Sequence, residues 1–143
     1  MDDHLDRADR LVVAAMRLTR TLQALAGRGP LTSPQVGALI VVVYAGRIVA
    51  KELAALQQVT PATMSRLVAE LEARALVTRS PDEKDARLQW IEPTREGRAL
   101  VKTEHRRRLK SLAQAMGKLS SDERQRLGEA AALIERLTQD LAS

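Results

Sequence analysis

Cysteine is absent from this sequence of 143 residues. Its absence excludes structural disulfides, thiolate metal sites and sensing by thiol oxidation. Aromatic residues are nearly as scarce, because phenylalanine is absent and Tyr44 and Trp90 are the only tyrosine and tryptophan. A protein that stacks single-stranded bases on aromatic side chains is therefore not expected. The two histidines, His4 and His105, lack the spacing of metal ligands, and no sequence motif indicates a cofactor.

Long apolar segments are also missing. The longest apolar run, GALIVVVYAG at residues 37–46, is too short to span a bilayer. The charged N-terminus MDDHLDRADR lacks the apolar core of a signal peptide, so the sequence predicts a cytoplasmic protein without a membrane partner. No Ser/His/Asp set, carboxylate pair or phosphate-binding loop is evident, and we therefore do not expect an enzyme.

Positive charge is in moderate excess, with 23 Lys and Arg residues against 18 Asp and Glu residues and a formal net charge of +5. Such an excess favours a polyanionic partner. The length fits one domain, or one domain with an appended dimerisation element.

Helical spacing of apolar residues predicts helices near both termini. Residues 5–25 carry this pattern, and GRGP at residues 27–30 is expected to end the helix. Thr94 is expected to cap a long helix, and Ser120 or Ser121 to start the last one. The last helix has an apolar stripe with the three-four spacing of paired helices: Leu127, Ala130, Ile134, Leu137 and Leu141.

Three shorter helices are expected between these ends. Ser33 is a candidate N-cap for a buried helix over residues 36–44, although the β-branched residues 40–43 could instead form a strand. The segment AKELAALQQ predicts a short helix with three inward side chains, which are Leu53, Ala54 and Leu56. Thr60 caps the third helix, and Pro61 occupies its first turn. The buried stripe of that helix comprises Met64, Leu67, Val68 and Leu71.

The exposed front of the third helix carries slim side chains and one arginine: Pro61, Ala62, Thr63, Ser65 and Arg66. The major groove of B-DNA is about 12 Å wide, so an entering helix must present short side chains where its backbone comes closest. Thr63 and Ser65 can donate to phosphates or bases, and Arg66 can bridge O6 and N7 of guanine. A solvated or salt-bridged surface would tolerate the same residues, so this stretch alone leaves both interpretations open.

Two β-prone segments, VTRS and RLQWIE, flank the polar tip PDEKDA and predict a β-hairpin. The second strand is expected to stop by Glu92, because Pro93 cannot donate to a ladder. An aspartate of the tip could hold an arginine through a charge-assisted pair, which leaves one cation to reach a DNA minor groove. The alternative is a polar turn in which aspartate accepts from backbone N–H groups.

Short helix, turn, capped helix and β-hairpin follow in the order of a winged helix-turn-helix. The sequence predicts a mainly α fold in which residues 31–94 form this DNA-binding domain with a two-stranded β-wing. Residues 1–30 and 95–143 are expected to form dimerisation helices, because their apolar stripes exceed what a small domain can cover alone. A monomer whose terminal helices fold back on their own domain is the alternative.

Residues 53–97 resemble the MarR family of bacterial transcriptional regulators through ELAALQQVTPATMSRLVAELEARALVTRS, DEKDAR and PTREG. The layout on both sides agrees, so the resemblance covers essentially the whole chain. It implies a homodimer that binds a palindromic double-stranded DNA operator, usually as a repressor. It further implies DNA contacts from the recognition-helix residues Pro61, Ala62, Thr63, Ser65 and Arg66, and from the wing residues Asp82, Lys84, Asp85 and Arg87.

The resemblance also implies release by a small aromatic or phenolic ligand between the dimer helices and the DNA-binding lobe, although a protein without any ligand is an alternative. The chain departs from the family pattern at five positions, one of which is Pro93, where an apolar residue is usual. Lys84 replaces the usual arginine of the tip, Ala86 replaces a frequent basic residue, and Gln58 and Ala75 stand where glycine is common. The main alternative function is a winged-helix module that binds another protein without operator specificity.

Overall fold

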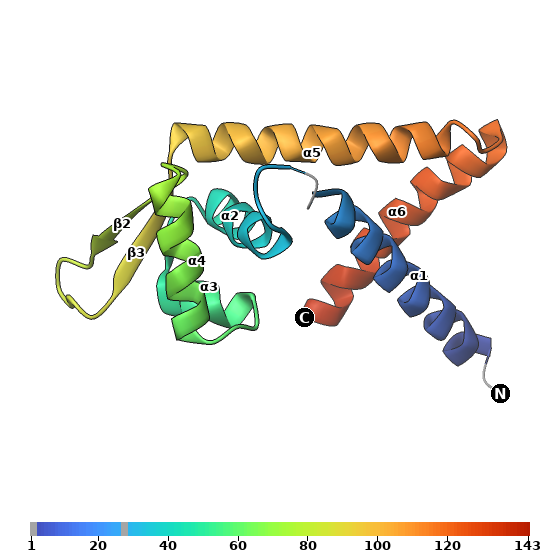
Figure 1. Ribbon diagram of the computed structural model, residues 1–143. Helices are drawn as coiled ribbons and strands as arrows, with labels where there is room; N and C mark the ends of the chain where they lie inside the picture. Colours follow the sequence, from blue (N-terminus) through green and yellow to red (C-terminus); the bar gives the residue numbers. More distant parts are fainter. Residues whose placement is uncertain (1–2, 27–28) are drawn as a thin grey trace. The chain divides into compact units, whose positions relative to one another are not determined.

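The computed structural model describes residues 3–26 and 29–143 (Figure 1). Its elements follow in the order α1 (Asp3–Ala26), α2 (Ser33–Ala45), β1 (Ile48–Val49), α3 (Ala50–Leu56), α4 (Pro61–Ala73), β2 (Val77–Pro81), β3 (Gln89–Pro93), α5 (Arg95–Met116) and α6 (Ser121–Ala142). Internal contacts divide the chain into a first unit that ends at Arg108 and a second unit from Leu109 to Ser143. Helix α5 thus contributes to both units.

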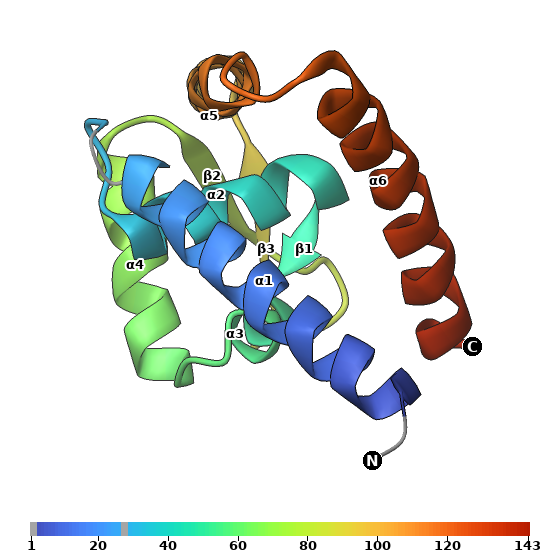
Figure 2. The ribbon, with the colours of Figure 1, turned by 90° about the vertical axis from the view of Figure 1, so that its right-hand side faces the viewer.

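A small antiparallel sheet belongs to the first unit, with β3 between β1 and β2 (Figure 2). β2 and β3 form the predicted hairpin, whose register runs from Val77 opposite Pro93 to Pro81 opposite Gln89. β1 pairs with the other edge of β3 through only two residues. It was not predicted, because two residues are too few to show the alternation that identifies a strand.

Helices α2, α3 and α4 and the hairpin form the predicted winged helix-turn-helix (Figure 1). Their shared core contains the whole predicted stripe of α4, together with Leu53 and Ala54 of α3. The expectation that Leu56 points inward was wrong, since 59% of this residue is exposed. The chain turns directly after this residue, and Val59 packs against the core beyond the turn.

Residues 40–43 are helical, which decides between the two alternatives for α2 in favour of the helix. The cap of α2 is Thr32, and the expectation of Ser33 was wrong. Gln35 accounts for the difference, because its side chain accepts the Thr32 N–H at 2.9 Å while its own N–H donates to the Thr32 hydroxyl at 3.4 Å. Only a cap three residues before Gln35 can form this reciprocal box. Ser33 instead donates its hydroxyl to the Gln23 carbonyl.

Strand β3 includes Pro93, one residue beyond the predicted end at Glu92. The backbone N–H of Thr94 donates to the Leu76 carbonyl at 3.0 Å. Because backbone groups alternate along a strand, the nitrogen of Pro93 faces away from β2. Proline therefore removes no hydrogen bond from the hairpin at this position.

The long helices begin as the sequence predicts. Thr94 accepts the Gly97 N–H at 3.0 Å at the start of α5. Ser120 forms a reciprocal capping box with Glu123 at the start of α6. Helix α1 is described as far as Ala26, and the predicted stop at Gly27 lies outside the described residues. Within residues 3–26 and 29–143, no helix is both long and apolar enough to span a membrane.

Gln58 and Ala75 occupy the left-handed backbone region, with φ of 54° and 58°. Each follows a helix that closes with a hydrogen bond back over five residues, from Val59 N–H to the Ala54 carbonyl and from Leu76 N–H to the Leu71 carbonyl. Such endings favour glycine. Gln58 and Ala75 therefore adopt the left-handed turn geometry that glycine usually provides at these helix ends.

Replacement of Gln58 or Ala75 by glycine is expected to raise the free energy of unfolding by about 1 kcal/mol at each position. The left-handed region costs other residues about 1–2 kcal/mol, and the greater freedom of glycine in the unfolded chain offsets part of the gain. Denaturant unfolding at equal protein concentration measures the change. Gln57→Gly is the control, since φ of Gln57 is −85° and glycine should there only destabilise. Equal effects at residues 57 and 58 would contradict the expectation.

Candidate nucleic-acid interface

The first turn of α4 is held by its cap. Thr60 accepts the Thr63 N–H at 3.1 Å, and the Thr60 hydroxyl donates to the Thr63 hydroxyl oxygen at 3.0 Å. Pro61 then begins the helix at a position where a backbone N–H would lack a helical acceptor. The N–H groups of this turn and the positive end of the helix dipole favour an anion such as a phosphate.

The predicted recognition residues lie at the start of α4 and reach the surface. Pro61, Ala62, Ser65 and Arg66 are exposed, and Thr63 is half-buried beside the cap. Arg66 makes no hydrogen bond or ion pair with any residue of the described ranges 3–26 and 29–143. The interpretation of Arg66 as a salt-bridged surface residue therefore finds no support, and its guanidinium keeps all its donors for an external acceptor.

Two polar contacts join the recognition helix to the first turn of α2 and to the segment before it. The buried Gln35 donates its side-chain amide to a Glu70 carboxylate oxygen at 2.7 Å, so the capped first turn of α2 is connected to the last turn of α4. Arg74, just beyond the end of α4, donates to the Pro30 carbonyl at 3.0 Å. These contacts and the buried stripe fix the orientation of α4, which is the condition for presenting Arg66 at a defined place.

The front of α4 borders the strands of the hairpin. A small groove of about 150 Å³ is lined by Pro61 and Ser65 from α4 and by Arg79 and Gln89 from the two hairpin strands. Two of the predicted recognition residues, Pro61 and Ser65, therefore share one surface with the strands of the hairpin.

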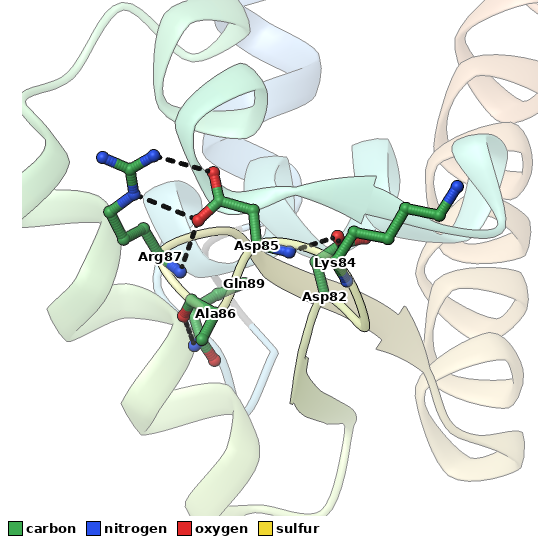
Figure 3. Close-up of polar contacts among 6 residues, drawn as sticks. All are labelled: Asp82, Lys84, Asp85, Ala86, Arg87 and Gln89. Carbon is green, nitrogen blue, oxygen red and sulfur yellow. Dashed lines mark hydrogen bonds and ion pairs between the residues drawn. The ribbon is translucent and has the colours of Figure 1, made fainter.

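The wing tip contains the predicted pair of an aspartate and an arginine (Figure 3). Arg87 Nε donates to Asp85 Oδ1 at 3.0 Å, and Arg87 Nη2 donates to Asp85 Oδ2 at 3.3 Å. The ion pair with Arg87 and its backbone N–H together hold the pKa of the Asp85 carboxyl below its usual value. The Arg87 side chain is nevertheless 90% exposed. The pair thus fixes the direction of an arginine that remains open to solvent.

Lys84 lies on the other side of the tip, and Figure 3 shows its side chain pointing away from Arg87. The two cations of the wing therefore differ in kind. Arg87 is held by two hydrogen bonds to a carboxylate, whereas Lys84 is an exposed ammonium group on a flexible stem. Both could meet a polyanion, but only Arg87 has its orientation set in advance.

Asp82 holds the turn itself. Its Oδ2 accepts the backbone N–H groups of Lys84 and Asp85, each at 3.0 Å, and its Oδ1 accepts the indole N–H of Trp90 at 2.8 Å. The indole bond and the two backbone bonds hold the pKa of Asp82 below its usual value, because each stabilises the ionised carboxylate. The two alternatives for the tip thus both apply, with Asp82 satisfying the backbone and Asp85 holding the arginine.

Arg47 is a further residue of this network that the sequence did not identify. Its guanidinium carbon lies 4.1 Å from the centre of the Trp90 ring, within the range of a cation–π contact, and its Nε is 3.2 Å from a Glu92 carboxylate oxygen. Trp90 thus contacts both Asp82 and Arg47. Trp90 follows Asp82 by eight residues across the predicted hairpin, which was the available signal for their contact. To use it, the register of β2 and β3 had to be known.

A capped helix with a slim front, joined to a hairpin that carries an oriented arginine, defines a DNA-binding protein of the winged helix-turn-helix class. Residues 29–88 match the model of the MarR family. The chain is 31% identical over 140 residues to an uncharacterized HTH-type transcriptional regulator of Mycobacterium leprae, with 98% of each chain covered. An HTH-type transcriptional regulator of Mycobacterium tuberculosis has the same identity and coverage. The chain therefore belongs to the MarR family of transcriptional regulators.

Solved structures share the fold over almost the full length. A putative transcriptional regulator of Pseudomonas aeruginosa is 27% identical with a TM-score of 0.86, and the match covers 97% of both chains. The C80S mutant of MarR from Escherichia coli is 23% identical with a TM-score of 0.72, and the match covers 94% of this chain and 96% of that one. At this lower identity the similarity concerns the fold alone.

Proposed function

We propose that the protein is a sequence-specific transcriptional regulator that binds a palindromic operator as a homodimer and represses the genes beside it. The observation that carries the proposal is the unpaired, exposed Arg66 on a helix that packing and polar contacts hold in place. Pro61 and Ser65 of the same helix border the strands of the wing. Regulators of this class read sequence by inserting such a helix into the major groove.

In this proposal, α4 enters the major groove with its slim residues foremost. Ala62 and the Thr63 methyl group are short enough to touch a thymine methyl, and Ser65 donates to a phosphate or a base edge. Arg66 lies one helical turn into the helix and bridges O6 and N7 of a guanine. Its freedom from internal partners supports this role, because no ion pair has to break before it binds.

The wing reaches the adjacent minor groove. A narrow minor groove concentrates negative potential and attracts arginine. Arg87 suits this position, because the bidentate pair with Asp85 orders its side chain before DNA arrives and so reduces the entropy lost on binding. Lys84 contributes charge to a nearby phosphate, while Asp82 and Asp85 organise the tip and do not themselves face the DNA.

Dimerisation follows from the apolar faces of the terminal helices. In α6, the side chains of Leu127, Leu133, Ile134, Leu137 and Leu141 are exposed. In α1, the exposed apolar side chains include Leu5, Leu11, Val12, Val13, Met16 and Leu18. Faces of this size are costly in water, and a second copy of the chain would cover them. A twofold axis would then place the two recognition helices about 34 Å apart, which is one turn of DNA.

A small acidic ligand would bind within the first unit. A cavity of about 360 Å³, within the range of ligand pockets, is lined by Gln23, Gly37, Ile40, Val59, Leu67 and Arg108. Apolar walls and one cation suit an aromatic carboxylate. Because Leu67 belongs to α4, an occupant in contact with it would bear directly on the recognition helix.

A binding titration with the upstream region of the protein's own gene tests the proposal. Fluorescence anisotropy is followed with the specific duplex and with a scrambled duplex of equal length, at several salt concentrations. The proposal predicts tighter binding to the upstream region that persists at physiological salt. Equal and weak affinity for both duplexes would instead favour the module that binds another protein.

Replacement of Arg66 by alanine is expected to cost about 1–3 kcal/mol of specific binding and to relax selectivity at one base position. The loss arises because a bidentate contact to guanine disappears while phosphate contacts remain. Titration against operators substituted at each position in turn measures both effects. Arg106→Ala serves as the control, because Arg106 is an exposed arginine of α5 that, like Arg66, makes no hydrogen bond or ion pair with the described residues. Unchanged selectivity in the Arg66 variant would remove this residue from base recognition.

A further inference from the structure

We propose that Trp90 and Arg47 position the DNA-binding wing, with the indole N–H of Trp90 orienting the carboxylate that builds the wing tip. This inference rests on the proposed function, because it assigns a task to residues that would not touch the DNA. Trp90 is then a positioning residue, which influences DNA affinity only through the orientation of Arg87.

The chain of contacts begins at Asp82, which uses both carboxylate oxygens. Oδ2 accepts the N–H groups of Lys84 and Asp85, and Oδ1 accepts the Trp90 indole at 2.8 Å. The Asp82 N–H also donates to the Leu88 carbonyl at 2.9 Å, which closes the loop. A carboxylate held at one oxygen presents the other in a fixed direction. The indole therefore determines how well the tip amides are capped.

The tip amides in turn determine where Arg87 points. The Asp85 N–H that Asp82 caps belongs to the same residue whose side chain holds Arg87 in two hydrogen bonds. The Arg87 N–H donates to Asp85 Oδ1 as well, at 3.1 Å. Three successive links thus lead from the indole to the exposed guanidinium, namely Trp90 to Asp82, Asp82 to Asp85, and Asp85 to Arg87. Each contact is charge-assisted, because each has an ionised carboxylate as the acceptor.

Arg47 fixes the indole from the side of β1. Its guanidinium lies over the Trp90 ring and pairs with Glu92, so it is held by both neighbours on β3. The pairing of Val49 with Trp90 brings the backbone after Arg47 alongside the indole. Strand β1, although only two residues long, therefore attaches the base of the wing to the end of α2.

The test uses the full-length protein with Trp90→Phe, which keeps an aromatic face for Arg47 but removes the N–H donor. Hydrogen exchange of the Lys84 and Asp85 amides is measured without DNA, and operator affinity is measured in both the wild-type and the Arg87→Ala background. Tyr44→Phe is the control, because it alters the only other aromatic side chain, which is exposed. Asp82→Asn provides a second variant that weakens the same contact with little change of shape.

The expected result is exchange several-fold faster at the two tip amides, with exchange in the α4 core unchanged. Operator affinity should fall by about tenfold, as for loss of a hydrogen bond to a charged group. In the Arg87→Ala background Trp90→Phe should have no further effect, because coupled residues are not additive. Unchanged exchange at the tip amides, or an equal loss of affinity in both backgrounds, would overturn the inference. If wild-type protein fails to prefer any duplex, the proposed function fails, and the exchange measurement alone then decides the role of Trp90.

Discussion

Gly97→Ala is expected to lower the free energy of unfolding by about 3 kcal/mol, at the upper end of the cost of overpacking. A Cβ atom at this position would lie 2.1 Å from the backbone oxygen of Leu76 and 3.4 Å from Leu39 Cδ1. A flexible side chain could move aside, but the Leu76 carbonyl is fixed, because it accepts the Thr94 N–H at 3.0 Å. The start of α5 must therefore separate from the end of α4 or the hairpin must shift.

Thermal unfolding at equal protein concentration measures this effect, with a decrease in Tm of roughly 10 °C expected for a chain of this size. Gly128→Ala in α6 is the matched control, since among residues 3–26 and 29–143 an added Cβ there meets no atom within 4 Å beyond its chain neighbours and the backbone of its own helix. Alanine exceeds glycine by about 1 kcal/mol in helix propensity, so the control should be stabilised. Destabilisation of both variants to the same extent would show that the contact with Leu76 is not the cause.

The helix starts were predictable because their signals are local. Each of three helix starts combines a capping residue with a suitable first turn. The caps are Thr60 before Pro61, Thr94 three residues before Gly97, and Ser120 three residues before Glu123. The α4 stripe follows from periodicity alone, because its four apolar residues occupy one helical face. Two predictions were wrong for local reasons. Thr32 and Ser33 are adjacent candidates for the same N-cap, and Leu56 lies at the end of a helix, where the inward pattern stops.

The recognition residues were named from the sequence, but the arrangement that supports them was not. Gln35 contacts Glu70 across 35 positions of the chain, and Arg74 contacts Pro30 across 44. Such pairs depend on tertiary packing, which a local pattern does not reveal. The Asp85–Arg87 pair was predictable, since its members are two positions apart in the sequence. The link from Asp82 to Trp90 instead required the hairpin register.

Ile134→Glu is expected to produce a monomer that binds the operator at least about 100-fold more weakly. The proposed dimer joins two half-sites in one molecule, and linked sites gain about 10²–10⁴ in apparent affinity. A carboxylate in the α6 stripe must lose its hydration to enter the interface. The apolar side chains there offer no hydrogen-bond donors to replace the lost water, so burial of the charge is costly. Ile134 is exposed in the single chain, so the substitution should leave the fold of α6 intact.

Gln139→Glu provides the matched control, because it adds the same charge to an exposed residue of α6 outside the stripe. Sedimentation equilibrium compares the molecular mass of the three proteins, and anisotropy titration compares their operator affinity. The proposal requires a dimeric wild type, a dimeric Gln139 variant and a monomeric Ile134 variant. A dimeric Ile134 variant would place the interface elsewhere. A monomeric wild type would favour terminal helices that fold back on their own domain, and α4 and the wing would then read only half of an operator.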